Sequence, residues 1–537
     1  MDTQNRLLLA ITLSLIILIV YQKVFIAPNT QEVKVNSNDA IQKQASNNRI
    51  ITVSSKAKPQ KQDENIAILE NAAIKIEITD NGAYVKQVWF KNFKDAKTNQ
   101  PIYLLAPETI NETLQGPLFL QDTFLEKPEQ QKWQLVTSSK NSATYLLKEP
   151  SGIEITKEIF LPNHNYSIGL RLKIINNATV AMPAKYKLIT NSSLFVKQGI
   201  DERFFGADIK TEQGIKRFHP KSKEIKDGGK IYYTSPEWLS LRGRYFSIAM
   251  EPKQKEEACF VEKETENSLC AGVIIGPVTI KPGEHEEKEF IVYAGPNDAD
   301  EIKNTSTNMT DVTSYGFFGG ISMLLLSVLK FFNRIFGNYG VAIIMLTVAI
   351  NIILFPLTAK SLKSFKDMQK IQPEMEKIRE EYKDNPQKQS KEMMGLYKKH
   401  KINPMGGCLP MAFQIIVIIP PLYQVLTRAV ILKGANFLWI KDLSDPDAVF
   451  KLPQAIPFLG EFINILPIVA TVLMFVQQKI SQPKTAQADQ QKAIATAMLV
   501  MAAVFFYNMP SGFLLYIITS TGIMLIMQEF VLKVRHT

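Results

Sequence analysis

The sequence predicts an α-helical polytopic membrane protein, with six transmembrane helices and one large all-β sandwich domain. Apolar segments of roughly 20 residues, the length that a spanning helix needs, gather in the C-terminal part. The chain has 537 residues, 62 Lys and Arg against 51 Asp and Glu, and a formal net charge of +11. Residues 61–310 hold 32 basic and 34 acidic side chains, so the positive excess lies outside them. A basic excess beside apolar segments favours a membrane protein over a nucleic-acid-binding protein.

The first 27 residues predict a transmembrane anchor. Arg6 precedes an apolar stretch, residues 7–21, that only Thr12 and Ser14 interrupt. A cleaved signal peptide would end in a small-x-small site, and the residues after this stretch form a poor one. We therefore expect an uncleaved anchor over residues 1–27 and a polar, flexible linker over residues 28–60.

Strand signals dominate residues 61–310. Ile74, Ile76 and Ile78 alternate with polar residues, and an Asp-Asn-Gly turn follows before the next strand signal. Residues 168–174 alternate in the same way. Residues 273–280 and 290–293 flank a Lys-Pro-Gly-Glu turn, which predicts another hairpin. About 240 residues of such units predict a large β-sandwich.

Five further segments predict transmembrane helices: residues 339–358, 409–432, 462–478, 493–509 and 512–532. The third and fourth have 17 residues each, which reach about 25 Å as helices, against a hydrocarbon core of roughly 30 Å. Either the helices extend beyond these apolar residues, or the membrane is thinner around them.

Lysine and arginine counts predict the orientation. Residues 359–408 hold twelve and residues 433–461 hold three, so the positive-inside rule places the first loop in the cytoplasm. With the N-terminus also inside, the anchor and residues 339–358 supply the two crossings that precede this loop. Residues 311–338, apolar enough around 321–336 to span, are therefore expected to form an interfacial amphipathic helix. The β domain and loop 433–461 become periplasmic; loop 479–492, tail 533–537 and both termini become cytoplasmic.

Residues 359–408 predict a cytoplasmic helical hairpin. Apolar residues recur every three or four positions between lysines and glutamates, Pro373 interrupts the first helix, and Asn385-Pro386 supplies the turn. The hairpin is either a solvated amphipathic pair or a docking surface for a partner or for lipid headgroups. The residues singled out here are Met375, Ile378, Tyr382, Met393, Met394 and Tyr397.

No catalytic or metal-binding motif occurs in the sequence: the five histidines are scattered, and GxSxG, HExxH, phosphate-loop and CxxC patterns are missing. Cys259 and Cys270 flank a polar, turn-like stretch in the β domain. In an oxidising compartment they form either a hairpin disulfide or two free thiols, and the sequence leaves both states open.

Polar residues interrupt the apolar segments. Such groups face a helix bundle or a hydrated cavity, because their exposure to hydrocarbon is unfavourable. Hydrogen bonding between helices explains any one of them, whereas together they suggest a hydrophilic cavity. The candidate cavity residues are Thr347, Asn351, Gln414, Tyr516, Thr519 and Ser520.

Several motifs resemble the YidC membrane-protein insertase family of Gram-negative bacteria. They are the residues 355–358 (Phe-Pro-Leu-Thr), 372–374 (Gln-Pro-Glu), 391–397 (Lys-Glu-Met-Met-Gly-Leu-Tyr), 403–410 (Asn-Pro-Met-Gly-Gly-Cys-Leu-Pro), 438–440 (Leu-Trp-Ile) and 510–512 (Pro-Ser-Gly). They occur in the family's order over roughly residues 316–534. The Asn-Pro-x-Gly-Gly-Cys stretch is the most specific of them.

The resemblance implies an insertase and folding chaperone of the inner membrane, not an enzyme, and no cofactor. It implies a five-helix core with a hydrophilic groove, along which nascent hydrophobic segments enter the bilayer, alone or with the Sec translocon and its accessory subunits. Ribosomes or targeting factors and phospholipids are the other implied partners, with no direct binding of nucleic acid.

The chain departs from the family pattern at two positions. Many members carry an arginine where this chain has Asn351, and a second aromatic residue where it has Ile517. Two other functions compete with the insertase: a secondary transporter or channel, which internal repeats and broken helices would favour, and an envelope glycan-binding module anchored in the membrane.

Overall fold

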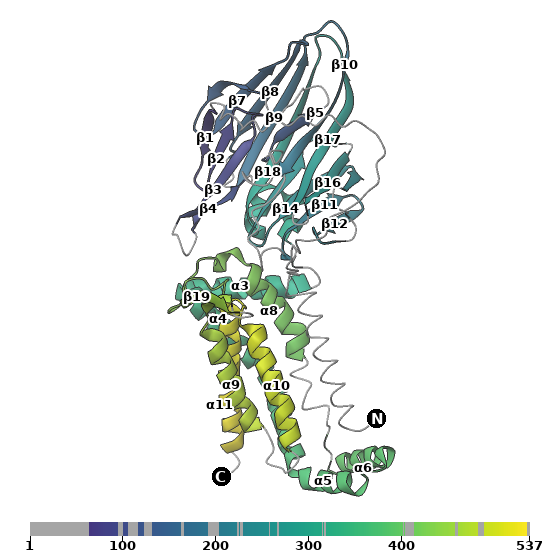
Figure 1. Cartoon of the computed structure of the whole chain (residues 1–537), viewed down its shortest axis with the longest axis vertical. Helices are drawn as coiled ribbons and strands as arrows, with labels where there is room; N and C mark the ends of the chain where they lie inside the picture. The colour runs from purple at the N-terminus through teal and green to yellow at the C-terminus, as the bar shows by residue number, and fades with distance from the viewer. Residues whose placement is uncertain are drawn as a thin grey trace, which may run out of the picture. The chain divides into compact units, whose positions relative to one another are not determined.

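The computed structural model describes residues 64–94, 100–105, 116–122, 131–162, 166–191, 203–222, 225, 229–256, 258–265, 268–313, 315, 318–400, 402, 413–456, 460–481 and 488–533. The predicted anchor (1–27), the linker (28–60), the stretch 403–410 and the tail 534–537 lie outside these residues. The chain divides into two compact units, one of strands and one mainly of helices (Figure 1).

Eighteen strands follow in chain order among the described residues of the strand unit. They are β1 (Ile66–Glu70), β2 (Ile74–Thr79), β3 (Val85–Lys94), β4 (Pro101–Leu105), β5 (Phe119–Asp122), β6 (Gln134–Ser138), β7 (Ser142–Lys148), β8 (Ile153–Phe160), β9 (Ser167–Asn176), β10 (Met182–Asn191), β11 (Gly206–Thr211), β12 (Gly214–Phe218), β13 (Lys230–Thr234), β14 (Pro236–Arg242), β15 (Phe246–Pro252), β16 (Ala258–Thr265), β17 (Ser268–Ile280) and β18 (His285–Pro296).

These strands form three sheets. The largest has nine strands in the order β12-β11-β14-β15-β18-β9-β8-β7-β6, the second has five in the order β13-β16-β17-β10-β5, and the third has four in the order β1-β2-β3-β4. Strands of the two larger sheets pack against each other, β14 against β16 and β17, and β10 against β15. The predicted β-rich domain is therefore confirmed, with two facing sheets at its centre.

Alternation along the strands builds the core. In the antiparallel pair of β8 and β9, Ile155 lies opposite Ile174 and Ile159 opposite Leu170. All four side chains are fully buried. Each such burial contributes about 1.5–3 kcal/mol relative to an exposed side chain, so the period-two pattern of the sequence fixes which face of the sheet is covered.

One core position on β8 holds a lysine. The ammonium group of the fully buried Lys157 donates to the carbonyl oxygens of Gly82, Ala83 and Leu118, each at 3.0 Å. It also lies 4.8 Å from the centre of the Trp133 ring. Because a buried cation is tolerated only when its donors are satisfied, Lys157 ties the largest sheet to the turn after β2 and to the residue before β5.

The turn between β2 and β3 matches its prediction. Gly82 has φ of +81°, the left-handed region that glycine adopts without steric penalty. A Cβ at this position would lie 2.8 Å from the Phe119 ring, so the turn needs glycine for space as well as for backbone conformation.

The predicted hairpin around residues 281–284 is wrong in its pairing. Strands β17 and β18 flank the turn, but β17 lies in the five-stranded sheet between β16 and β10, and β18 lies in the nine-stranded sheet between β15 and β9. The turn is therefore an arch between two sheets. It is held to the end of β9, because Asn176 donates from Nδ2 to the Ile280 carbonyl at 2.8 Å and accepts the Gly283 N–H at its backbone oxygen.

The possible disulfide between Cys259 and Cys270 is not formed. Both side chains are buried, and neither is part of a disulfide. In the β16–β17 pair, Cys259 lies opposite Val273 and Cys270 lies opposite Glu262. Cys259 and Glu262 are three residues apart in β16, so the two cysteines point to opposite faces of the sheet.

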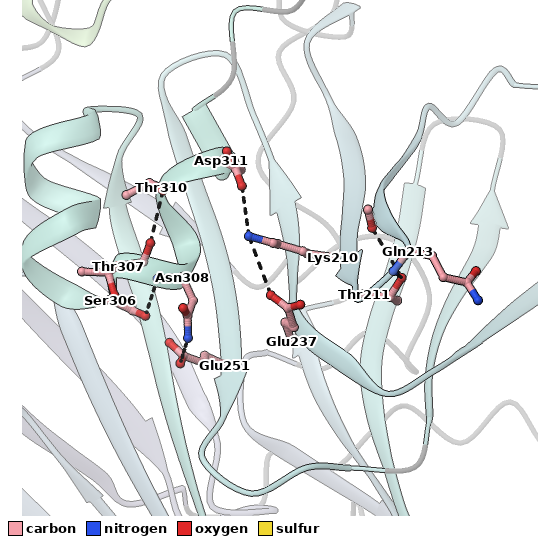
Figure 2. Close-up of polar contacts among 11 residues, drawn as sticks. Lys210, Thr211, Gln213, Glu237, Glu251, Ser306, Thr307, Asn308, Thr310 and Asp311 are labelled. Atoms are coloured by element: carbon pink, nitrogen blue, oxygen red, sulfur yellow. Dashed lines mark hydrogen bonds and ion pairs between the residues drawn. The ribbon is translucent and has the colours of Figure 1, made fainter.

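The last segment of the strand unit folds back onto its surface. It includes the short helices α2 (Ala299–Thr305) and η4 (Thr307–Thr313). Figure 2 shows Lys210 between Asp311 of η4 and Glu237 of β14, at 3.1 and 3.7 Å. Nearby, Asn308 donates to the carboxylate of Glu251 at 3.1 Å. Exposed ion pairs of this kind contribute at most about 1 kcal/mol, so they position η4 more than they stabilise it.

The helical unit contains eight α-helices, two short 3₁₀ or π segments and one small hairpin in its described residues. They are α3 (Gly319–Phe336), α4 (Tyr339–Lys370), α5 (Gln372–Glu381), α6 (Pro386–Lys399), the π-helix η6 (Gln414–Ile418), α8 (Ile419–Arg428), η7 (Val430–Leu432), β19 (Phe450–Ile456), β20 (Gly460–Ile463), α9 (Leu466–Ser481), α10 (Ala488–Phe506) and α11 (Ser511–Lys533). Helix α4 packs against α3 and α11, and α11 packs against α8 and α9.

Three of these helices contain stretches long and apolar enough to cross a membrane: Gly319–Phe336, Tyr339–Ser364 and Ser511–Glu529. Shorter apolar helices cover Ile416–Arg428, Leu466–Ile480 and Thr496–Phe506. The first of the long stretches, α3, falls within residues 311–338, for which the sequence predicts an interfacial helix. It buries Ser322, Leu325 and Leu329, and packs against α4 and α8.

Several predicted helix boundaries shift. Helix α10 runs from Ala488 to Phe506 where 493–509 is predicted, and the predicted helix 409–432 ends as an α-helix at Arg428. The segment 462–478 begins as a helix only at Leu466, because Gly460–Ile463 pairs with β19 as strand β20. Helix α9 therefore has 16 residues, about 24 Å in length. Helix α4 includes Pro356 and continues beyond residue 358 to Lys370, so the first part of the predicted hairpin is an extension of this helix.

Candidate functional site: a polar cluster between apolar helices

Three elements of the helical unit carry the predicted cavity residues. Helix α4 carries Thr347 and Asn351, η6 begins with Gln414, and α11 carries Tyr516 and Ser520. Each pair within a helix is four residues apart, so its two members lie on one face. Because α4 packs against α11, these faces bring the polar side chains together within apolar surroundings.

The cluster is joined by amide and hydroxyl groups. Gln414 donates from Nε2 to the Tyr516 hydroxyl at 3.0 Å and lies 3.5 Å from the Ser520 hydroxyl. Asn351 reaches the same Ser520 hydroxyl from the other side at 3.5 Å, and donates to the Thr347 carbonyl at 2.8 Å. Ser520 is thus the point at which all three elements meet.

The predicted residues differ in how they take part. Tyr516 and Thr347 are buried, and Asn351, Gln414 and Ser520 are half-buried. Thr347 and Thr519 donate to the carbonyl oxygens of their own helices, at Ile343 and Leu515, each at 2.7 Å. Their hydroxyls are therefore already engaged, and the hydrogen bonds across the helices come from the two amides, Tyr516 and Ser520.

A π-helix positions Gln414. In η6 the N–H of Ile419 bonds to the Gln414 carbonyl, five residues earlier. Pro420 and Pro421 follow at the start of α8 and have no N–H, so they cannot continue the regular hydrogen bonding of the preceding turn. Single π-turns recur at functional sites. The prolines were visible in the sequence, but the π-turn that they accompany was not predicted.

The cluster has donors and acceptors but no charged group. The side chains that bond across the helices are two carboxamides, Asn351 and Gln414, and two hydroxyls, Tyr516 and Ser520, which can bind water or a polar backbone. Within the described ranges, no group of His, Cys, Asp and Glu side chains is arranged to hold a metal ion.

The segment between η7 and β19, residues 433–449, forms a second polar network, which no pattern in the sequence predicted. Lys433 pairs with Asp442 at 3.0 Å and with Asp445 at 2.9 Å. The Asp445 carbonyl accepts the Ser511 hydroxyl at 2.7 Å, and the Leu443 carbonyl accepts the Gly512 N–H at 2.7 Å. The start of α11 is therefore fixed to this segment.

The same network reaches two other helices. The Asp447 carboxylate accepts the N–H groups of Ile465 and Leu466, at 2.8 and 3.1 Å, where α9 begins. A carboxylate there satisfies donors that a helix leaves unpaired and interacts favourably with the helix dipole. Asn464 donates to the Tyr507 carbonyl at 2.8 Å, just after α10 ends.

Lys433 is electrostatically perturbed. Burial on its own would lower the pKa of the Lys433 ammonium, but the carboxylates of Asp445 and Asp442 outweigh burial and raise this pKa. The charged form of Lys433 is thus stabilised by the fold, and sequence spacing alone gave no signal of this pairing.

The predicted hairpin residues mostly pack against one another. Met375 is buried with Ile371 and Leu396 between α5 and α6, and Ile378, Met393 and Tyr397 pack against this group. Tyr382 is half-buried and Met394 is exposed. The predicted turn is confirmed, since Asn385 caps α6 by accepting the Lys388 N–H at 3.1 Å. Most of the apolar residues predicted on the hairpin therefore form the hairpin's own core.

Two family models match the chain. The model of the 60Kd inner membrane protein matches residues 331–537, and that of the YidC periplasmic domain matches residues 67–328. A membrane protein insertase YidC from Pelobacter propionicus is 33% identical, over 70% of this chain and 69% of the relative. The corresponding protein of Geobacter sulfurreducens is 31% identical, over 73% of this chain and 71% of the relative. The chain belongs to the YidC membrane protein insertase family.

Similarity to YidC proteins extends along the whole chain. The membrane protein insertase YidC of Geotalea daltonii is 28% identical over 99% of both chains. A solved structure of an active YidC insertase is 17% identical, covering 86% of this chain and 94% of that one with a TM-score of 0.37. The inner-membrane description of the matching family agrees with the apolar helices of this chain.

Proposed function

We propose that this protein is a membrane protein insertase and folding chaperone of the bacterial inner membrane. Its substrates are nascent membrane proteins, whose hydrophobic segments enter the bilayer along the polar cluster of Asn351, Gln414, Tyr516 and Ser520. The observation that carries this proposal is the convergence of these uncharged polar side chains between apolar helices. Membership of the YidC family supports it.

The physical role of the cluster is to lower a barrier. A polar chain end that crosses hydrocarbon loses its hydration, which is unfavourable by several kcal/mol for each unsatisfied group. Half-buried amides and hydroxyls hold water within the bundle and replace part of that hydration. Burial of the apolar segment in the bilayer then drives the transfer, at about 25 cal/mol per Å² of apolar surface. No cofactor or nucleotide is needed for such a process.

This hydrophilic groove works without a fixed charge in our proposal. Asn351, which stands where the family resemblance implies an arginine, is engaged with Thr347 and Ser520. An amide offers hydrogen bonds but attracts no anion, so we infer that hydration dominates and that acidic substrate tails have little advantage.

The proposed topology follows from the apolar segments and the charge distribution. Six helices span the membrane: the N-terminal anchor (residues 1–27) and the five segments predicted after residue 338, which form the core. Helix α3 lies in the interface, and both termini face the cytoplasm. The strand domain and the segment of Lys433 face the periplasm, and the α5–α6 hairpin faces the cytoplasm, because its loop holds twelve lysines and arginines. Helix α9, about 24 Å long, supports a locally thin membrane.

We further propose that the protein acts alone on small substrates and with the Sec translocon and its accessory subunits on larger ones. The hairpin offers exposed lysines and the exposed Met394 to ribosomes, targeting factors or phospholipid headgroups. No role in binding nucleic acid directly is proposed, since the positive excess accompanies the membrane segments.

Site-specific photocrosslinking tests the proposal. A photoreactive residue replaces Gln414, and a matched control replaces Ile416, which lies in the same π-helix with 61% of its surface exposed. Native membranes receive a stalled nascent membrane protein. We expect crosslinks from position 414 only while a hydrophobic segment emerges, and lipid crosslinks from position 416. An intact protein that gives no crosslink at 414, beside a positive translocon control, contradicts the insertase and favours a transporter.

A further inference from the structure

The segment between η7 and β19 carries a tight turn whose two tip residues are apolar and exposed. Phe437 and Ile440 exchange two backbone hydrogen bonds, each 2.9 Å, so Leu438 and Trp439 form a two-residue tip. Ile440 is buried at the base of the turn. In contrast, 75% of the surface of Leu438 and 47% of that of Trp439 are exposed.

The backbone at the tip is strained. Leu438 has φ of +52°, a conformation that leucine rarely adopts and that glycine or asparagine would occupy more easily. Burial in a core would offset the strain of such a leucine, but this side chain is largely exposed. Strained residues of this kind cluster at functional positions, which makes the exposed side chain of Leu438 a candidate for a functional role.

The base of the turn is firmly held. A Cβ at Gly340 of α4 would lie 2.1 Å from the Phe437 ring, so this ring sits against the start of α4. Asn338 donates to the Asn436 carbonyl at 3.1 Å. The tip is therefore presented by a rigid base and is not a free loop.

The tip continues an apolar surface that already exists at this end of the helices. Asn338 follows α3 closely, and the last turn of α3 exposes Ile335 and Phe336. The hydrogen bond from Asn338 to Asn436 brings that end of α3 next to the turn. Apolar side chains from two segments, far apart in the sequence, thus lie at one level of the helical unit.

The chemistry of the tip fits the boundary between lipid headgroups and acyl chains. Tryptophan is enriched at that boundary, because its ring is apolar and its N–H is polar. The N–H of Trp439 lies 3.5 Å from the Asp447 carboxylate, and the exposed Lys441 follows two residues later, where an ammonium suits lipid phosphates. The exposed area of two side chains is far smaller than the roughly 800 Å² of surface that a stable protein partner covers.

We propose that Leu438 and Trp439 form a membrane anchor, which inserts into the interfacial layer of the leaflet at this end of the helices. The anchor fixes the depth of the segment that ties together the starts of α9 and α11. It is independent of the substrate path, which is tested at Gln414.

Depth-dependent quenching tests the anchor. The full chain with Cys408→Ser and Leu438→Cys is labelled with an environment-sensitive fluorophore and reconstituted into phosphatidylcholine and phosphatidylglycerol vesicles. The buried Cys259 and Cys270 remain unlabelled. Two controls carry the label at Ile353, an α4 residue with 74% of its surface exposed, and at Val180, a strand-unit residue with 68% exposed.

We expect lipids with a nitroxide high on the acyl chain to quench position 438 more strongly than lipids with a deep nitroxide. Position 353 should favour the deep nitroxide, and position 180 should respond to neither. A water-like, unquenched signal at 438 overturns the anchor. A shielded signal that no lipid quenches also overturns it, in favour of a protein partner.

A second variant separates an anchor from a packing residue. Leu438→Gly removes the side chain and relieves the steric strain of the positive φ. We expect its thermal midpoint in detergent to equal or exceed that of the unmodified protein. A clear fall in this midpoint assigns Leu438 to internal packing and overturns the proposal.

Discussion

Gln414 and Tyr516, 102 positions apart in the chain, meet through a 3.0 Å hydrogen bond from the Gln414 amide to the Tyr516 hydroxyl. This contact joins the π-helix η6 to α11 within an apolar helical unit. Polar residues in membrane helices have two explanations: a hydrogen bond that holds helices together, or a hydrated path for substrates. The two differ in how strongly the loss of the side chain should affect stability and insertion.

Replacing Gln414 with leucine tests this distinction. An interhelical hydrogen bond in a membrane contributes roughly 0.6 kcal/mol, which corresponds to about a threefold change in an equilibrium constant. We expect Gln414→Leu to lower stability by no more than that, and to lower insertion of a nascent segment well beyond threefold. The measurements are unfolding in detergent and protease protection of the inserted segment. Equal, small effects on both would make Gln414 a purely structural residue.

Introducing a charge at Asn351 tests how the cluster handles acidic substrates. We expect Asn351→Arg to change insertion of neutral and acidic tails by a similar, small factor, because hydration and not attraction governs the unmodified protein. Asn351→Gln is the matched control that keeps the amide. A large gain confined to acidic tails would instead show that the missing charge limits the protein, and a steep fall of unmodified activity with salt would contradict a hydration mechanism.

Replacing Lys433 with methionine should destabilise the helical unit by roughly 3–5 kcal/mol, since it leaves neighbouring carboxylates without their buried cation. Lys433→Met combined with Asp442→Asn and Asp445→Asn should recover most of that loss. Lys451→Met, at an exposed lysine of β19, should stay within about 0.5 kcal/mol. Thermal unfolding in detergent gives all three values. A loss that the neutral triple variant does not recover would assign the effect to packing.

The stability that Lys433 supplies should depend on pH in one direction. Its folded pKa is raised, so its contribution is complete below the ordinary lysine value of about 10.4 and is lost as pH rises through the folded pKa. We expect no change from this group between pH 6 and 9, and a fall at more alkaline pH that Lys433→Met lacks. Parallel alkaline titrations of the two proteins provide the measurement.

The two cysteines of the strand domain should behave as buried thiols. Burial raises the pKa of the Cys259 thiol to about 12, so at pH 8 only about one molecule in 10⁴ carries a thiolate there. We expect alkylation of the native protein to be very slow at Cys259 and Cys270, and complete after denaturation, with the same mass shift with and without reductant. A mass shift that needs reductant would restore the disulfide.

Replacing Lys157 with methionine keeps the length of the side chain but removes its ammonium. Three buried carbonyl oxygens then lose their donor, and each unsatisfied group costs about 1–3 kcal/mol. We expect a loss of at least about 3 kcal/mol in denaturant unfolding of the full chain. Lys148→Met, at an exposed lysine of β7, is the control. A near-neutral Lys157→Met would mean that water replaces the lysine.

Local patterns account for the features that the sequence predicted correctly. Alternating isoleucines identify β2, and alternating isoleucines and leucines identify β9, because a strand with one buried face has a period of two. Long apolar stretches identify α4 and α11, and Asn385 followed by proline marks the start of α6, because caps act within one helical turn. These features depend on residues close together in the chain.

Only the tertiary structure decided which residues far apart in the sequence lie next to one another. The turn at residues 281–284 is visible in the sequence, but only the sheets show that β18 pairs with β9 instead of β17. The spacing of Cys259 and Cys270 allows a disulfide, whereas the strand register turns the two side chains to opposite faces of the sheet.

The candidate site shows the same division. The sequence by itself determined that Asn351, Gln414 and Ser520 are polar residues in apolar helices, because each contrast lies within one segment. Only the tertiary structure decided that they meet at one hydroxyl and that Lys433 sits between two aspartates. The physical reason is that helix packing, and not local propensity, sets which distant side chains come within hydrogen-bonding distance.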